Sequence, residues 1–181
     1  MGDHNPTYWG SDLYSAQKGH GKKWQICLSH QLRDCQFAID AGDVTFAWDV
    51  MKLFQRAIKL GKRRGEMDQQ CMKAVKRRVL QELNYLLEKI PPMTKEGRNL
   101  KRRYTEHRDS LFTFFDDARI NPTNNLSEQG LRPSVIFRKV TNGYRSDWGA
   151  DIYAAIRSVI GTGKRQGLTA HQSIQNILIP A

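Results

Sequence analysis

The chain has 181 residues, 39% of them hydrophobic, so it is long enough to bury the core of an ordinary domain. Its 29 Lys and Arg outnumber 18 Asp and Glu, and the net charge of +11 favours a polyanionic partner over a small-molecule substrate. It contains no apolar run of about eighteen residues and its first residues lack the order of a signal peptide, so we expect a cytoplasmic protein with no membrane partner.

The first predicted elements are two short strands and a helix. Residues 8–11 are aromatic-rich and are followed at once by Asp12, which predicts a strand with a carboxylate at its C-terminal end. After a glycine-rich turn, residues 24–27 predict a second strand. Apolar residues at 28, 32, 35 and 39 then predict a helix that ends at Gly42.

The middle of the chain predicts three more helices. Asp43 is placed to cap a helix whose apolar face runs from Phe46 to Leu60 and which Gly61 closes. Apolar spacing over 71–90 predicts a longer helix that stops at two consecutive prolines, and residues 100–111 predict a fourth.

The positive charge is concentrated in these helices. Residues 52–108 hold 17 Lys and Arg against 6 Asp and Glu, a net of +11, so the remainder of the chain sums to zero. This bias favours a nucleic-acid-binding surface, although solvated helix faces are the simpler alternative. A Lys-Arg-Arg triplet occurs three times: Lys62, Arg63, Arg64; Lys76, Arg77, Arg78; and Lys101, Arg102, Arg103.

A polar motif, residues 124–133, follows the basic segment. Asn125 can cap a helix in which Glu128 is the third residue, where backbone N–H groups and the helix dipole favour the ionised carboxylate. The motif therefore suits a metal ligand, but it also suits a capping box with a Glu128 to Arg132 pair one turn apart. Beyond it, residues 135–140 are β-branched and aromatic and predict a strand or an extended connection.

Two more helices are predicted at the C-terminal end. Apolar residues from Ile152 to Ile160 indicate a helix that leads to Gly167, and Thr169 with Gln172 forms a capping box for the last one. The three cysteines, Cys27, Cys35 and Cys71, are odd in number and have apolar neighbours, so we expect reduced thiols in the core.

Two acidic residues, each at the end of a predicted element, are the candidate metal ligands. Asp12 and Glu128 could hold Mg²⁺, which needs one or two carboxylates together with water and phosphate oxygens. Spacing alone is a weak argument, because 18 acidic residues offer many pairs. Cys27 and His30 have the spacing of half a zinc site, but no second pair matches it, and packing is the simpler interpretation.

Five short motifs follow one another along the chain: Ser11-Asp12-Leu13-Tyr14, Cys27 to Asp34, Asn124 to Glu128, Leu131-Arg132-Pro133 and Phe137-Arg138-Lys139. In these motifs, their order and their spacing, the chain resembles the insertion-sequence-66 transposases from about residue 8 onward. The resemblance implies an RNase H-like catalytic domain with an Asp-Asp-Glu triad that uses two Mg²⁺ ions to cut and join DNA ends. It assigns Asp12 to the second carboxylate and Glu128 to the third, with His30, Asn125 and Arg132 in supporting positions.

The resemblance also predicts how the chain is organised. We expect a mainly α fold with a few short strands, as the C-terminal portion of an RNase H-like α/β fold that carries a helical insertion. Residues 1–42 would be the end of the core with the second Asp, 43–118 the basic insertion, and 119–181 the C-terminal core helices. The first Asp of the triad has no counterpart here, so the chain looks like a fragment that is inactive alone.

Two functions follow from this interpretation. The first is a truncated transposase catalytic region whose partners are DNA and either the full-length transposase or a second copy of the chain. The alternative is a non-catalytic basic helical protein that binds nucleic acid. Metal dependence separates them, since binding through Lys and Arg needs no Mg²⁺.

Overall fold

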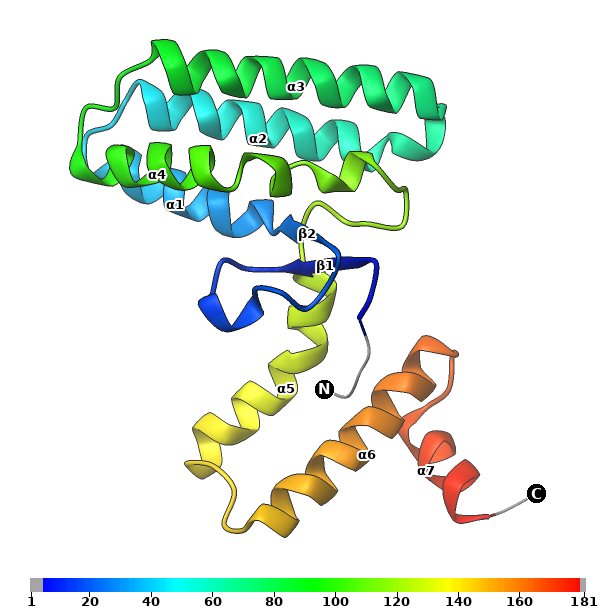
Figure 1. The fold of residues 1–181 in the computed structure, drawn as a ribbon. Helices are drawn as coiled ribbons and strands as arrows, with labels where there is room; N and C mark the ends of the chain where they lie inside the picture. The colour runs from blue at the N-terminus through cyan, green and yellow to red at the C-terminus, as the bar shows by residue number, and fades with distance from the viewer. Residues whose placement is uncertain (1–4, 180–181) are drawn as a thin grey trace. The chain divides into compact units, whose positions relative to one another are not determined.

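A computed structural model describes residues 5–179, which divide into two compact units between Asn125 and Leu126 (Figure 1). The described residues are mainly helical with one two-stranded sheet, as expected. The first unit contains β1 (Tyr8–Ser11), β2 (Lys23–Ile26), α1 (Leu28–Asp40), α2 (Phe46–Lys62), α3 (Gln69–Lys89), α4 (Lys95–Glu106) and the 3-10 turns η1 (Ser15–Gln17), η2 (Arg64–Glu66), η3 (Arg108–Ser110) and η4 (Thr113–Phe115). The second contains α5 (Asn125–Thr141, whose first residue closes the first unit), α6 (Asp147–Arg165) and α7 (Ala170–Leu178).

Both predicted strands are confirmed, and they pair in parallel. The register places Tyr8 beside Lys23 and Ser11 beside Ile26, so the two strands end at the same edge of the sheet. The indole of Trp24 donates a hydrogen bond to Ser11 Oγ at 2.8 Å and fixes this end of the pair. The residues that follow β1 and β2 are therefore neighbours.

The four helices of the first unit share one core. α2 packs against α1 on one side and α3 on the other, and α4 packs against α1 (Figure 1). The Phe54 ring on α2 lies 5.2 Å from Tyr104 on α4 and 6.0 Å from Phe112, both in edge-on contact. Such aromatic pairs add to the stability that area burial already supplies.

Thr45, and not the predicted Asp43, occupies the N-cap position of α2, but Asp43 still accepts a hydrogen bond from the first turn of that helix. Its fully buried carboxylate accepts hydrogen bonds from Ala47 N at 3.1 Å and from Met93 N at 2.9 Å, with Thr94 N at 3.4 Å. It therefore ties the start of α2 to the connection between α3 and α4. Gly97 leaves room for it, because a Cβ there would lie 1.7 Å from Asp43 Oδ2.

Two details of the predicted helices are wrong. Cys71 is exposed, and its neighbour Met72 takes the core position at the start of α3. α4 ends at Glu106, so the buried Leu111 reaches the core from the irregular segment after η3. In the first case the buried face of α3 starts one residue later than predicted, and in the second an irregular segment after the helix supplies the core residue.

The strand predicted over 135–140 is also wrong, because these residues lie inside α5 together with Pro133. The Phe137 ring stacks at 4.5 Å from Tyr153 on α6 and at 5.5 Å from Tyr144. These contacts stabilise the helical conformation of a β-branched segment, whose strand propensity depends strongly on its surroundings.

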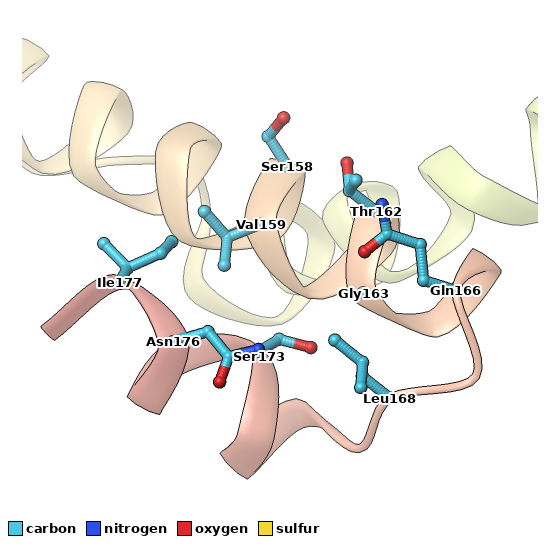
Figure 2. Close-up of a pocket in the computed structure, with 9 residues that line it drawn as sticks. All are labelled: Ser158, Val159, Thr162, Gly163, Gln166, Leu168, Ser173, Asn176 and Ile177. Carbon is cyan, nitrogen blue, oxygen red and sulfur yellow. The ribbon is translucent and has the colours of Figure 1, made fainter. Parts of the chain in front are cut away.

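The predicted helices α6 and α7 are confirmed. Thr169 and Gln172 form the expected capping box, and α7 crosses close to α6 where Gly163 meets Ser173. A pocket of about 290 Å³ lies between them (Figure 2). Its wall is uncharged, with Thr162 from α6, Gln166 directly after that helix and Asn176 from α7, so it offers no group for acid, base or metal chemistry. None of the helices in residues 5–179 is both long and apolar enough to cross a membrane.

Replacing Asp43 with Ala should lower the free energy of unfolding by about 3 kcal/mol, because buried backbone donors lose a charged acceptor. Urea unfolding of the full chain measures this change. Asp40→Ala is the control, since Asp40 is exposed and accepts a hydrogen bond from Gln36 on its own helix, and it should stay within about 0.5 kcal/mol. Equal losses in the two variants would contradict the role given to Asp43.

The thiols should differ in reactivity. Cys71 is exposed, whereas burial raises the pKa of Cys35 to about 12 and Cys27 is also buried. Because the thiolate is the reactive form, a disulfide reagent at pH 8 should modify Cys71 rapidly and the other two only on unfolding. Cys71→Ser should remove the fast phase, and a fast phase that survives this substitution would contradict the burial.

Candidate functional site

The two strands bring the candidate ligand Asp12 to the edge where β2 also ends. Ser11 O, at the end of β1, accepts a hydrogen bond from Cys27 N at 2.8 Å, so Asp12 and Cys27 begin their connections side by side. Asp12 is half-buried, and its Oδ1 accepts a hydrogen bond from Tyr14 N at 3.2 Å. This bond orients the carboxylate at the edge of the sheet.

α1 starts at the same edge, directly after Cys27. His30 lies in its first turn and is half-buried. Cys27 is buried, and its Sγ accepts a hydrogen bond from Asn124 N at 3.3 Å. Within the described residues no group of three or more His, Cys, Asp and Glu is placed to hold a metal ion.

The polar motif is reached from this edge. Pro122 O accepts a hydrogen bond from Leu28 N at 2.9 Å, and Asn124 N donates to Cys27 Sγ. The chain therefore approaches α5 beside the ends of both strands, although about a hundred residues separate β2 from this point. The basic helices form an excursion that leaves the sheet edge and returns to it.

The other residues of the motif lie on α5. Asn125 is its first residue, so Glu128 is the fourth and not the third, a difference of one position that is usual at helix ends. Glu128 and Arg132 are exposed and one turn apart. They belong to the second unit, so the distance between Asp12 and Glu128 stays a prediction.

The donor chemistry of these residues suits a divalent cation such as Mg²⁺. Mg²⁺ prefers oxygen ligands and takes one or two protein carboxylates, with waters and phosphate oxygens in the remaining positions. Asp12 accepts one hydrogen bond at Oδ1 and has no ion pair within the described residues, so it has lone pairs available for a metal. Glu128, the other candidate ligand, has its carboxylate in the first turn of α5.

Each basic triplet contributes one residue to an ion pair. Arg63 pairs with Glu66 at 3.1 Å, Lys76 with Asp116 at 2.7 Å, and Arg103 of α4 with Asp34 of α1. Arg64 donates to Asn121 Oδ1 at 3.3 Å, and partial burial lowers the pKa of its guanidinium. The others, Lys62, Arg77, Arg78, Lys101 and Arg102, have no ion pair within residues 5–179.

Sequence reasoning missed another set of cations. Lys52 and Lys59 are exposed on α2, and Lys52 Nζ lies 5.0 Å from the centre of the exposed Trp48 ring. Lys52 lies four residues after Trp48, and Lys59 lies seven residues after Lys52, so all three share one face of the helix. This spacing is the sequence signal that could have identified them, but neither lysine belongs to a Lys-Arg-Arg triplet.

Comparison with known proteins gave one family. A family model described as Transposase IS66 family matches residues 3–152, which include every candidate ligand and every basic residue named above. Searches of the curated proteins and of the solved structures found no match.

Proposed function

The chain belongs to the IS66 family of transposases, and from this membership we propose that it carries two carboxylates of a catalytic region for Mg²⁺-dependent cleavage and joining of DNA strands. Membership implies a function in transposition with DNA as the partner. The observation that supports the finer proposal is the shared edge of β1 and β2. Asp12 lies there, and Pro122 and Asn124 hold the approach to α5 at the same edge.

Asp12 and Glu128 would be the metal ligands of this region. Bound Mg²⁺ would polarise a phosphoryl oxygen and activate the attacking water or hydroxyl. Asp12 presents its carboxylate from the end of a strand, where Tyr14 N limits its rotation. His30, in the first turn of α1, would support the site as a hydrogen-bond donor, and Asn125 and Arg132 would flank Glu128 on α5.

The proposal extends to the fold. The parallel pair of β1 and β2 would be part of an RNase H-like sheet, in which parallel strands are normally covered by helices. α1 follows β2 directly and packs on the helices of the basic segment. On this proposal residues 43–118 are an insertion between two parts of the same core.

A second candidate function is nucleic-acid binding without catalysis. The net charge of +11 within residues 52–108 favours it, because phosphate contacts alone account for such a bias. The partner would then be DNA bound alongside the full-length transposase or a second copy of the chain. Binding that is unchanged by chelators of divalent metals supports this candidate for the helices, and it leaves the metal-dependent role of Asp12 as a separate question.

We expect the purified 181-residue chain to leave a supercoiled plasmid intact with Mg²⁺ or Mn²⁺. The resemblance assigns two carboxylates of the triad to this chain, and two are insufficient for a two-metal centre. Gel electrophoresis of the plasmid over time measures nicking. Nicking that disappears in Asp12→Ala would show that the chain is active alone.

Metal binding tests the ligands directly. Mn²⁺ bound to the chain, measured by electron paramagnetic resonance, should weaken about tenfold or more in Asp12→Asn and in Glu128→Gln. Asp40→Asn is the matched control, because Asp40 is exposed on α1 and lies at the other end of that helix. Equal Mn²⁺ affinity in all three variants would remove both carboxylates from the proposed site.

The third expectation is geometric. Asp12 and Glu128 should bring their carboxylates within roughly 8 Å of each other, since paired metal ions in such sites are about 4 Å apart. In a Cys71→Ser background, Asp12→Cys with Glu128→Cys should be joined efficiently by a short bifunctional thiol reagent. Asp12→Cys with Asp151→Cys is the control pair. Equal cross-linking yields for the two pairs, or no cross-link in the first pair, would contradict the proposed approach of Asp12 and Glu128. Glu128 would then have only a structural role at the start of α5.

A further inference from the structure

One ion pair joins the outer faces of α2 and α3. Arg56 on α2 pairs with Glu82 on α3, and their side chains keep 51% and 43% of their surface exposed. The pair therefore lies at the solvent-facing seam between the two helices. Residues three or four positions from Arg56 or Glu82 are their neighbours on this outer surface.

The neighbours of Arg56 are basic. Lys52 lies four residues before it and Lys59 three residues after it, and both are exposed. One turn before Lys52, Trp48 keeps 42% of its surface exposed, with Lys52 Nζ 5.0 Å from its ring centre. This face of α2 thus carries an aromatic ring followed by cations.

The neighbours of Glu82 continue the same pattern on α3. Arg78 lies four residues before it and Tyr85 three residues after it, both exposed, and Tyr85 keeps 58% of its surface in solvent. We define the α2–α3 surface by five residues: Trp48, Lys52, Lys59, Arg78 and Tyr85.

The charge of the α2–α3 surface is not balanced within the unit. Lys52, Lys59 and Arg78 have no ion pair among residues 5–179, and the carboxylate at its centre, Glu82, is already paired with Arg56. The other acids close in sequence to these residues are Asp49, half-buried in the first turn of α2, and Glu88, exposed three residues after Tyr85 on α3. Arg56 adds a fourth cation, so the cations still outnumber Glu82, Asp49 and Glu88. The surface therefore keeps an excess of positive charge.

The rest of the unit packs on the other side of α2. Phe54, on its buried face, contacts Tyr104 of α4 at 5.2 Å. Phe54 lies two residues from Lys52 and five from Lys59, which places it on the opposite side of the helix. α4 therefore leaves the α2–α3 surface open.

From this arrangement we propose that the α2–α3 surface binds single-stranded DNA. The three cations would contact phosphates, and the Trp48 and Tyr85 rings would stack on unpaired bases, which is the combination used by proteins that hold single strands. A surface that contacts only the phosphates of a duplex needs cations but no exposed aromatic rings. The inference rests on the proposed function solely for the choice of DNA as the nucleic acid, and it needs neither Asp12 nor a metal.

The test measures binding of the full chain to a fluorescent oligothymidylate and to a duplex of the same length, in EDTA, by anisotropy. We expect tighter binding to the single strand. Lys52→Gln, Lys59→Gln and Arg78→Gln together should weaken it about tenfold or more and reduce the slope of log K against log salt by about 2, since single strands release about 0.7 counterions per contact.

A charge-matched variant outside α2 and α3 is the control. Lys22, Lys95 and Arg98 are exposed, have no ion pair in the described residues and belong to none of the basic triplets. Changing all three to Gln removes the same charge and should weaken binding less than threefold. An equal loss in the two triple variants would mean that net charge alone drives binding, and would overturn the proposal.

The rings supply the second arm of the test. Trp48→Ala and Tyr85→Ala should each weaken single-strand binding by about 5- to 100-fold, whereas Trp48→Phe and Tyr85→Phe should keep most of it. Thermal melts of each variant separate this loss from unfolding. Preference for the duplex, or equal affinities of the Ala and Phe variants, would overturn the proposal, as would no binding at all. Mn²⁺ binding that Asp12→Asn leaves unchanged would instead count against the proposed function only.

Discussion

The buried side chain of Gln25 holds the helical excursion against the sheet. Its Nε2 donates to Leu111 O at 3.0 Å and its Oε1 accepts from Phe114 N at 2.8 Å, so one amide fixes both sides of the segment that follows α4. Thr113 Oγ1 adds a hydrogen bond to Trp24 O at 2.7 Å. An apolar residue at position 25 would leave two buried backbone groups unpaired, which is costly. Because these bonds return the chain to β2, Pro122 can reach Leu28, and the polar motif begins at the edge that holds Asp12.

The parts of this fold that the sequence predicted well are those with strong local signals. Gly42, the prolines at 91 and 92 and the Thr169 capping box each limit backbone conformation within a few residues, and each lies at a helix end in the structure. The strand prediction for residues 135–140 was wrong because a short β-branched run does not distinguish a strand from a helix. The deciding contact, Phe137 on Tyr153, joins two helices and cannot be read from either segment alone.

The candidate site shows the same limit. Asp12 and His30 could be placed after strands, but their common edge depends on parallel pairing, which the sequence pattern left open. The sequence predicted the type of the basic residues and the segment that holds them, but only partly which of them share one surface. Successive residues of a helix point about 100° apart, so a Lys-Arg-Arg triplet spreads around the helix, and Lys76 and Arg103 turn toward Asp116 and Asp34. Spacing by three and four residues is what gathers side chains on one face.

The origin of the paired carboxylates explains why so much positive charge is left over. Asp34 and Asp116 form ion pairs with residues of the basic helices, although both lie outside residues 52–108. Glu66 and Glu82 lie inside this segment and pair with arginines of the same segment. The helices have too few carboxylates to neutralise Lys52, Lys59 and Arg78, and mutual repulsion among these cations opposes the compact state. A bound polyanion removes that repulsion, and because it binds the folded helices it also stabilises them. On the proposed binding, the charge that weakens the free unit is the same charge that would drive its association with DNA. It lies on a face that α4 leaves open, away from the packing of Phe54 and Tyr104.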